Sequence, residues 1–262
     1  MNNFAYDISL KGNRLNNEDR HVIYIKNGVE LLGLFDGHGG NVISTYLSEV
    51  VSGLFLNNKR YTLSFPVEPK IVNSIYKYID DSIKNKFGKV AYESGSTCLL
   101  SFIFTKNRKK YIQILNTGDS RIILCKKQNR RRYPIQLSND HKPDNINEYI
   151  RLNNMSKKIT NDGCVWRVGS LSVSRSFGDY DSKPYIISTP EMSIIEIDSN
   201  DEFILIACDG LWDVMSNVEV INFIDGRLKN NVDPKVIIKE LANEAINLSS
   251  EDNISIIIKF LQ

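Results

Sequence analysis

The sequence has few cysteines, and their spacing argues against both a disulfide scaffold and a zinc site. Among 262 residues there are four, Cys98, Cys125, Cys164 and Cys208, and none belongs to a Cys-x-x-Cys pair. Three of them lie in or beside apolar runs that are typical of strands. We therefore expect the cysteines to be reduced core residues.

Long hydrophobic runs and an excess of one charge are also absent. No apolar stretch approaches the roughly 20 residues of a membrane span, and the N-terminal segment 1–14 lacks the profile of a signal peptide. The 33 basic residues nearly balance the 31 acidic ones, so charge gives no reason to expect nucleic acid or an anionic membrane as a partner. We expect a monomeric intracellular protein, cytoplasmic or nuclear, that binds neither nucleic acid nor a membrane.

What the sequence has in abundance is short runs of β-branched and aromatic residues bounded by turn residues. These runs predict strands. Two short polar links, 105–110 and 118–120, predict antiparallel hairpins between the runs that they join. The predicted strands are 4–10, 21–25, 29–35, 98–104, 111–115, 121–125, 193–197, 203–208 and 254–260.

Amphipathic helices are predicted between the strands. Apolar residues recur at helical spacing in 41–56, 70–87 and 233–247. The last segment opens with Asp233 as a predicted N-cap and Pro234 at the first helical position. The elements together predict one α+β domain, in which helices pack outside antiparallel sheets.

Acidic residues border several of the predicted strands. One apolar run ends at Asp36-Gly37, and a second ends at Asp209-Gly210. A single Asp-Gly pair is typical of a tight turn, and we interpret both glycines as residues that permit such turns and let backbone carbonyls approach a metal. Strand ends of a shared sheet can bring their carboxylates together in space. Further acidic residues at strand ends are Glu18, Asp19, Asp119 and Asp252.

Converging carboxylates need a cation, because they repel one another and raise one another's pKa. Clustered oxygen atoms select hard divalent ions such as Mg²⁺ or Mn²⁺. Two such ions about 4 Å apart can deprotonate a water and hold a phosphoryl oxygen, and phosphoryl transfer needs mostly positioning and charge neutralisation. Arg14 could bind a phosphate in a fork and His38 could protonate the leaving oxygen. Taken alone, Arg14 is an ordinary surface charge and His38 an ordinary turn residue.

Eight short motifs occur in one order along nearly the whole chain. They are G-x-R-x-x-N-E-D (12–19), F-D-G-H-G-G (35–40), G-S-T (95–97), N-x-G-D-S-R (116–121), D-H-K-P (140–143), L-S-V-S-R-S-F-G-D (171–179), C-D-G-L-W-D-V (208–214) and E-D-N (251–253). Together they resemble the metal-dependent protein serine/threonine phosphatases of the type 2C family. The resemblance implies a single catalytic domain, 1–262, with two packed antiparallel sheets flanked by helices, a four-layer α-β-β-α arrangement with a metal pair at one end. It also implies hydrolysis of phosphoserine and phosphothreonine in phosphorylated protein substrates.

The resemblance implies a metal role for each acidic motif residue. Asp19 would support the residues that contact the ions, and Asp119, with Asp209, would serve a weaker third ion. The residues that would reach the Mg²⁺ or Mn²⁺ pair directly or through water are Asp36, Gly37 through its carbonyl, Asp209, Asp252 and Glu18.

The resemblance also implies residues that act on the substrate. Arg14 would bind phosphate and His38 would be the general acid. Arg175 is a candidate substrate-binding position, and Asp213 a supporting one. The region 138–182 has little periodicity and is interpreted as a surface lid; within it, residues 152–168 follow the family's flap sequence only loosely.

Two other functions stay open at this point. A phosphatase-like binding module would recognise phosphoproteins without turnover, but such domains usually lose metal carboxylates that are present here. An aspartyl-phosphate phosphatase would need a second Asp two residues after its nucleophile, where His38 stands. Two further features are interpreted without function: the basic run 126–134 as a solvated hairpin loop, and Asp225-Gly226 as a turn.

Overall fold

Strands with apolar residues on both faces lie between two separate cores. In β3 (Val29–Phe35), Leu31 and Phe35 belong to one core, whereas Leu32 and Leu34 belong to another. Successive side chains of a strand point to opposite faces, so a continuous apolar run can fill both cores. The computed structural model describes residues 4–58, 62–129, 131–156, 159–161, 163 and 165–261.

The long strands form two five-stranded sheets whose neighbouring strands are all antiparallel. The first sheet has the order β1-β15-β14-β8-β9 and the second β13-β7-β6-β3-β2. The bounds in the first sheet are Ala5–Leu10 (β1), Arg121–Gln128 (β8), Arg131–Gln136 (β9), Asp201–Ala207 (β14) and Ile254–Phe260 (β15). Those in the second are Arg20–Lys26 (β2), Val29–Phe35 (β3), Cys98–Lys106 (β6), Lys109–Thr117 (β7) and Glu191–Glu196 (β13).

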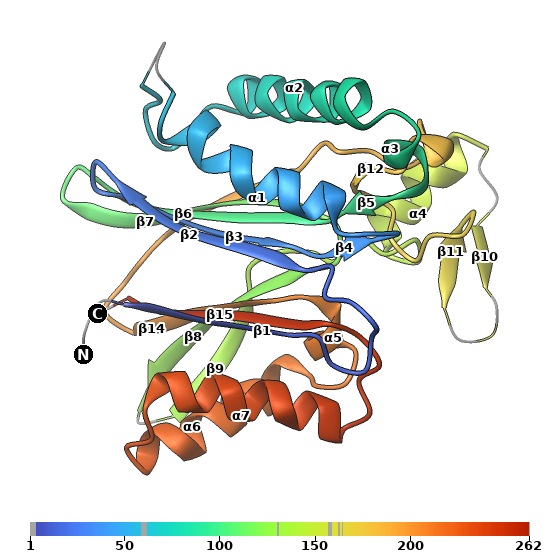
Figure 1. Cartoon of the computed structure of the whole chain (residues 1–262). Helices are drawn as coiled ribbons and strands as arrows, with labels where there is room; N and C mark the ends of the chain where they lie inside the picture. Colours follow the sequence, from blue (N-terminus) through green and yellow to red (C-terminus); the bar gives the residue numbers. More distant parts are fainter. Residues whose placement is uncertain are drawn as a thin grey trace.

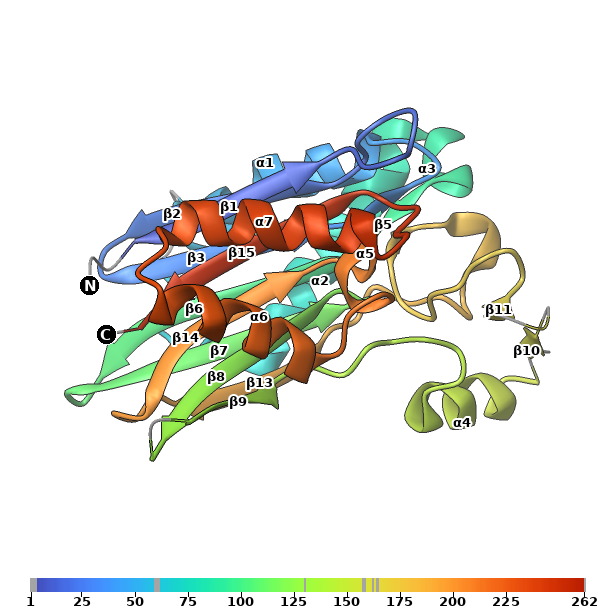
Figure 2. The same cartoon turned by 90° about the horizontal axis from the view of Figure 1, so that it is seen from below.

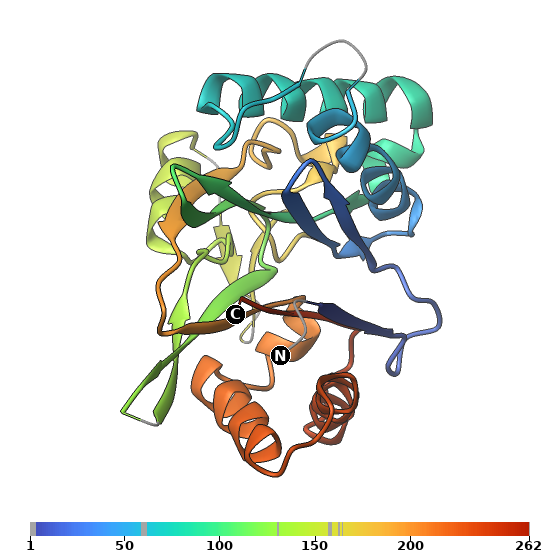
Figure 3. The same cartoon turned by 90° about the vertical axis from the view of Figure 1, so that its left-hand side faces the viewer.

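The two sheets stack on each other and helices cover both outer faces, so the predicted four-layer α-β-β-α fold is confirmed (Figures 1 and 3). Apolar residues of both sheets form the middle core. Helices α1 and α2 bury one apolar face each against the second sheet, and α6 and α7 do so against the first. The long helices are Val42–Phe55 (α1), Pro69–Phe87 (α2), Asn217–Lys229 (α6) and Pro234–Asn247 (α7).

Shorter elements gather at one end of this sandwich (Figures 1 and 2). A three-stranded sheet has the order β12-β5-β4, and β10 pairs with β11 in a separate hairpin. These short elements lie in the connections between the long strands, at the end of the sandwich where β3, β7 and β14 stop (Figure 1). The bounds are Gly37–His38 (β4), Gly95–Ser96 (β5), Phe177–Gly178 (β12), Ile159–Asn161 (β10), Trp166–Val168 (β11), Val90–Glu93 (α3), Ile146–Asn154 (α4), Tyr180–Ser182 (η1) and Asp209–Trp212 (α5).

The predicted hairpin at 118–120 is wrong, whereas the one at 105–110 is confirmed. Strands β6 and β7 pair, but β7 and β8 belong to different sheets. Ile114 of β7 and Ile122 of β8 both lie in the middle core, so the two strands stack face to face instead of pairing. The link carries the chain from one sheet to the other.

One predicted helix is confirmed, one predicted turn lies within a helix, and one helix was not predicted. The helix at 233–247 is confirmed, and the Asp233 side chain accepts a hydrogen bond from the backbone N–H of Lys235 at 2.8 Å. The predicted turn at Asp225-Gly226 is wrong, because both residues lie inside α6. The aperiodic region 138–182 contains α4, which the sequence did not predict.

The basic run forms the hairpin of β8 and β9, as expected, but three of its cations, Lys126, Lys127 and Arg132, pair with carboxylates of the protein. Lys126 pairs with Asp198 and Asp201, and Arg132 pairs with Glu202 and Asp225. Arg130 lies outside the described residues, as does Cys164, while the other three cysteines are buried free thiols. None of the helices in the described ranges has the length and apolar character needed to cross a membrane.

Candidate active site

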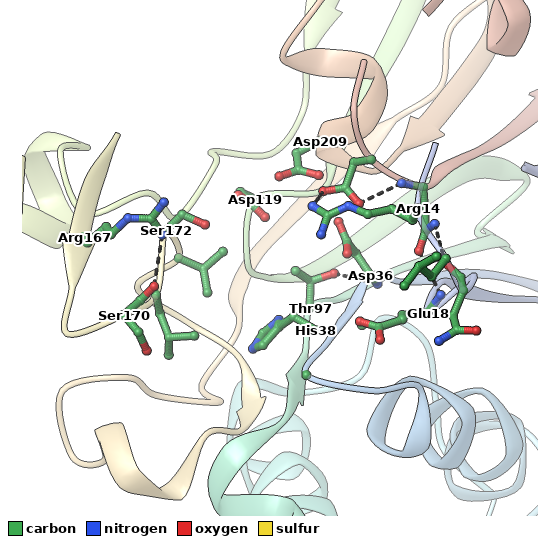
Figure 4. A pocket seen from close by; sticks show the side chains of 18 residues that line it. Arg14, Glu18, Asp36, His38, Thr97, Asp119, Arg167, Ser170, Ser172 and Asp209 are labelled. Carbon is green, nitrogen blue, oxygen red and sulfur yellow. Dashed lines mark hydrogen bonds and ion pairs between the residues drawn. The ribbon is translucent and has the colours of Figure 1, made fainter. Parts of the chain in front are cut away.

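A pocket of about 500 Å³ opens at the end of the sandwich where strands of both sheets stop. The segments that line it are the loop before β2, the residue after β3 with β4, the residue between β5 and β6, the link before β8, β11 with the stretch that follows it, the start of α5 and the residues just before β15. Figure 4 shows Asp119 and Asp209 on one side of Asp36 and Glu18 on the other. Residues that are far apart in the sequence therefore face one space.

Asp36 belongs to two clusters of side chains whose candidate metal-ligand atoms lie close together. One oxygen from each of Asp36, Asp119 and Asp209 lies within 4.8 Å of the others. A second group joins Asp36 to Asp19 and to the thiol of Cys208, again within 4.8 Å. Asp36 follows β3, Asp119 is on the link between the sheets, and Asp209 begins α5, so three chain segments contribute to the first group.

Burial and mutual repulsion make these carboxylates reluctant to ionise. Burial raises the pKa of Asp36 well above its usual value, and the charges of Asp19 and Asp209 raise it further. Burial likewise raises the pKa of Asp119, with the charge of Asp209 adding to it. Mainly through burial, the pKa reaches about 7 for Asp19 and about 6 for Asp209. A cation in the pocket would remove this penalty.

The chemistry of the donors fits a hard divalent cation. Both carboxylate oxygens of Asp19 and Oδ2 of Asp119 are buried without a hydrogen-bond partner within the described part of the chain. Such orphaned acceptors are costly unless they bind something. Burial raises the pKa of Cys208 well above its usual value, so its sulfur stays protonated and is a poor ligand. The usable donors are oxygens, as Mg²⁺ and Mn²⁺ prefer.

Arg14 and Asp252 reach the pocket together. Nη2 of Arg14 lies 2.7 Å from Oδ2 of Asp252, and its Nε donates to the carbonyl of Glu251 at 3.0 Å. The Arg14 side chain is 56% exposed, so its guanidinium stays accessible to an anion in the pocket. Asp252 lines the pocket without joining either close group of oxygens.

Glu18 and Gly37 meet at the wall of the pocket. The carbonyl of Glu18 accepts a hydrogen bond from Ser44, and a Cβ on Gly37 would lie 2.5 Å from that carbonyl oxygen. A Cβ on Gly210 would lie 2.0 Å from the carbonyl of Asn253. Gly37 lies in β4 and Gly210 in α5, and neither has a positive φ, so the interpretation that they serve tight turns is wrong. Lack of space for a side chain is what requires them.

Asn253 organises the same wall, and the sequence did not single it out as a site residue. Its Oδ1 accepts the backbone N–H of Glu18 at 2.8 Å. Its Nδ2 donates to the carbonyls of Lys11 and Asn16 at 2.8 and 2.9 Å. The amide thereby fixes the loop that carries Arg14 and Glu18 against the start of β15. The only sequence signal was its place in the E-D-N motif.

Asp119 has a cationic neighbour where a third metal ion was expected. Nζ of Lys142 lies 4.0 Å from Oδ2 of Asp119 and 2.7 Å from Oδ1 of Asp213. Burial acts to lower the pKa of Lys142, but the charge of Asp119 and the hydrogen bond to Asp213 raise it overall. The ammonium is therefore charged and partly balances Asp119.

His38 lines the pocket and is bound from behind by an aspartate. Its Nε2 lies 2.8 and 3.0 Å from the two carboxylate oxygens of Asp179. Burial lowers the pKa of His38, but the hydrogen bond and the charge of Asp179 outweigh it and raise the pKa above its usual value. The protonated ring that a general acid needs is favoured.

Arg175 does not reach this pocket, so the structure does not support the predicted substrate contact. Its Nε and Nη2 bind Oε1 of Glu148 at 3.1 and 2.6 Å, and its Nη1 donates to the carbonyl of Thr189. A mostly buried guanidinium needs such a carboxylate. Burial acts to raise the pKa of Glu148, but hydrogen bonds and charge from Arg175 and Arg151 lower it to about 2. Arg175 thus anchors α4.

The flap contributes other residues to the pocket. Arg167, in β11, and Ser170, two residues after that strand, line the pocket (Figure 4). Arg167 donates a hydrogen bond to the carbonyl of Ser170 at 3.0 Å. The neighbouring Trp166 is 39% exposed. Residues 157–158, 162 and 164 of the flap lie outside the described residues.

Comparison with known proteins agrees with this arrangement. The family model "Protein phosphatase 2C" matches residues 7–254. Probable protein phosphatase 2C 7 of Oryza sativa subsp. japonica is 34% identical over 259 residues, which are 97% of this chain and 64% of the relative. Probable protein phosphatase 2C 59 of Arabidopsis thaliana is 33% identical over 262 residues, with 97% of this chain and 79% of the relative covered.

A solved structure shares the fold. The serine-threonine phosphatase 2C of Toxoplasma gondii superposes with a TM-score of 0.80 at 21% identity, covering 98% of this chain and 94% of that one. The chain spans less than two-thirds of the rice relative's length. The motifs, the two-sheet fold, the carboxylate pocket and the family match over residues 7–254 lead to one assignment: the chain belongs to the protein phosphatase 2C family.

Proposed function

We propose that this protein hydrolyses phosphoserine and phosphothreonine in phosphorylated proteins with the help of two divalent cations. The observation that carries the proposal is the close approach of Asp36, Asp119 and Asp209 oxygens, within 4.8 Å, in an open pocket. Membership of a metal-dependent phosphatase family supports it. Mg²⁺ and Mn²⁺ both suit the oxygen donors.

The residues that would hold the cations come from both sheets. They are Asp36, the carbonyl of Gly37, Asp209, Asp252 and Glu18, with Asp19 as a buried support and Asp119 toward a weaker third ion. When bound, the ions would supply a nucleophilic water at neutral pH and polarise the phosphoryl group. To serve as a ligand, Asp252 would have to share its carboxylate with Arg14 or release it.

Arg14 and His38 would act on the substrate. Arg14 carries a forked, permanently charged guanidinium at the pocket edge, which suits two oxygens of a phosphate. His38, held protonated beside Asp179, would donate a proton to the serine or threonine oxygen as it leaves. The stretch 167–173 faces these groups across the pocket and would contact the polypeptide of the substrate.

The direct test is phosphate release from phosphoserine and phosphothreonine peptides. The purified protein should be active with Mn²⁺ or Mg²⁺ and inactive after chelation by EDTA. A folded protein that releases no phosphate with either ion would overturn the proposal. In that case, titration calorimetry would test the alternative of a phosphatase-like binding module, which would bind phosphopeptide without binding divalent metal.

A further inference from the structure

The contact between His38 and Asp179 joins two residues 141 positions apart. The His38 side chain is 30% exposed at the pocket, whereas that of Asp179 is 4% exposed. Asp179 does not line the pocket and belongs to neither close group of oxygens. Its carboxylate therefore faces the histidine ring and not the metal position.

Asp179 is itself held in place by two hydrogen bonds. Ser176 donates its hydroxyl to Oδ2 of Asp179, and the backbone N–H of Asp179 donates to the carbonyl of Ser94 at 3.0 Å. The residue has a φ of +53°, a left-handed conformation that residues other than glycine adopt at a cost. Such strain persists only where the surroundings determine the conformation, and it is common at functional sites.

The small sheet β12-β5-β4 sets the distance between the two partners. Asp179 follows β12, His38 ends β4, and Gly95 of the middle strand lies between them. A Cβ on Gly95 would lie 2.1 Å from Oδ2 of Asp179 and 2.6 Å from Nε2 of His38. Only glycine leaves room for this pair to close.

The geometry points to Asp179 as a positioning residue that fixes the imidazole of His38 through Nε2 and leaves Nδ1 as the nitrogen that delivers a proton to the substrate. The inference rests on the proposed function. In the step it serves, a water oxygen forms the new bond to phosphorus and the ester P–O bond breaks, with its electron pair on the serine or threonine oxygen. The Nδ1 proton completes that hydroxyl, and the proton lost by the water goes to solvent.

The test compares two substrates in the Asp179→Asn variant. A phosphothreonine peptide has a poor leaving group that needs a proton, whereas p-nitrophenyl phosphate has a good one that does not. We expect kcat on the peptide to fall about 100-fold, the lower range for general acid catalysis, and kcat on p-nitrophenyl phosphate to change less than about threefold. Asp181→Asn, an exposed neighbour, is the matched control and should leave both rates unchanged.

A double-mutant cycle with His38→Gln tests whether Asp179 acts through the ring. Asp179→Asn should have no further effect in that background. Equal losses on both substrates, no loss on either, or a further loss in the His38→Gln background would each overturn the inference. If Asp179→Asn does not fold, Ser176→Ala should give the same substrate selectivity with a smaller loss. A wild-type protein that hydrolyses neither substrate would instead reject the proposed function.

Discussion

At the residue scale, Asp36 is fixed by its backbone so that its carboxylate is available to the pocket. Its N–H donates to Oγ1 of Thr97 at 3.0 Å, and its carbonyl accepts the N–H of Thr97 at 2.8 Å. Thr97 Oγ1 also lies 3.0 Å from the hydroxyl of Ser120, next to Asp119. The hydrogen bonds thus link two of the clustered aspartates through their neighbours.

Asp209→Asn should abolish most turnover while preserving the fold. The substitution keeps the shape of the side chain but removes one charge from a repelling cluster. Because Asp209 is a proposed metal ligand, we expect kcat to fall by at least about 100-fold. The unfolding free energy of the metal-free protein should stay equal or rise. Phosphopeptide kinetics and urea unfolding measure both, with exposed Asp144→Asn as control. Activity within about threefold of wild type would contradict a ligand role.

The sequence predicted the clustered aspartates but not the residues that position them. Asp36, Asp119 and Asp209 were found because each borders an apolar run, and strand ends of stacked sheets converge. The roles of Asn253 and Asp179 depend on partners more than 100 positions away, which local patterns do not reveal. Arg175 was misplaced for the same reason: its charge is matched by Glu148, on a helix that the sequence did not predict.

At the element scale, α6 shows two local signals in conflict. Ser216 and Glu219 form a capping box, a sequence pattern that indicates the start of a helix. Asp225-Gly226 is typical of a turn, yet both residues lie in the helix, where Val220, Ile221 and Ile224 pack into the outer core. Burial of that apolar face outweighs the helix-breaking tendency of glycine, about 1 kcal/mol relative to alanine.

Gly226→Ala should therefore stabilise the protein. A Cβ at this position meets nothing within 4 Å, and φ is not positive, so the gain should approach the intrinsic helix preference of about 0.5–1 kcal/mol. Gly210→Ala is the contrasting variant, because its Cβ would clash with the carbonyl of Asn253, and it should lower stability. Urea unfolding of both variants is the measurement. A loss of stability in Gly226→Ala would mean that α6 is not held as described.

At the scale of the whole molecule, the pocket joins the two sheets. Asp36 follows β3 of the second sheet, whereas Asp209 follows β14 and Asp252 precedes β15 of the first. Asp119 lies on the link that crosses between them. The pairing of the sheets through the middle core therefore sets the distances among the acidic groups, and folding gathers charges that repel.

The metal-free protein should lose stability as the pH rises from about 4 to 7. Asp19 and Asp209 have folded-state pKa values of about 7 and 6 against 3.8 when exposed, so the folded state binds more protons in this window. Stability then falls with rising pH. Mn²⁺ should raise the melting temperature more at pH 8 than at pH 5, since at pH 8 it relieves repulsion and displaces few protons.

Thermal unfolding with EDTA or with Mn²⁺ at the two pH values checks this expectation. The Asp209→Asn variant is the control, because with one acid fewer its metal-free form should depend less steeply on pH. Equal stabilisation by Mn²⁺ at both pH values would show that the buried acids do not titrate as described.

The acidic groups of the pocket come from two different sheets. Because Asp36 follows β3 of one sheet and Asp209 follows β14 of the other, any sliding of one sheet over the other would move their carboxylates apart. An ion bound by carboxylates of both sheets would oppose that sliding. The affinity for the ion would then depend on how the two sheets are aligned, and a substitution that loosens the middle core would weaken metal binding in the pocket before it unfolds the protein.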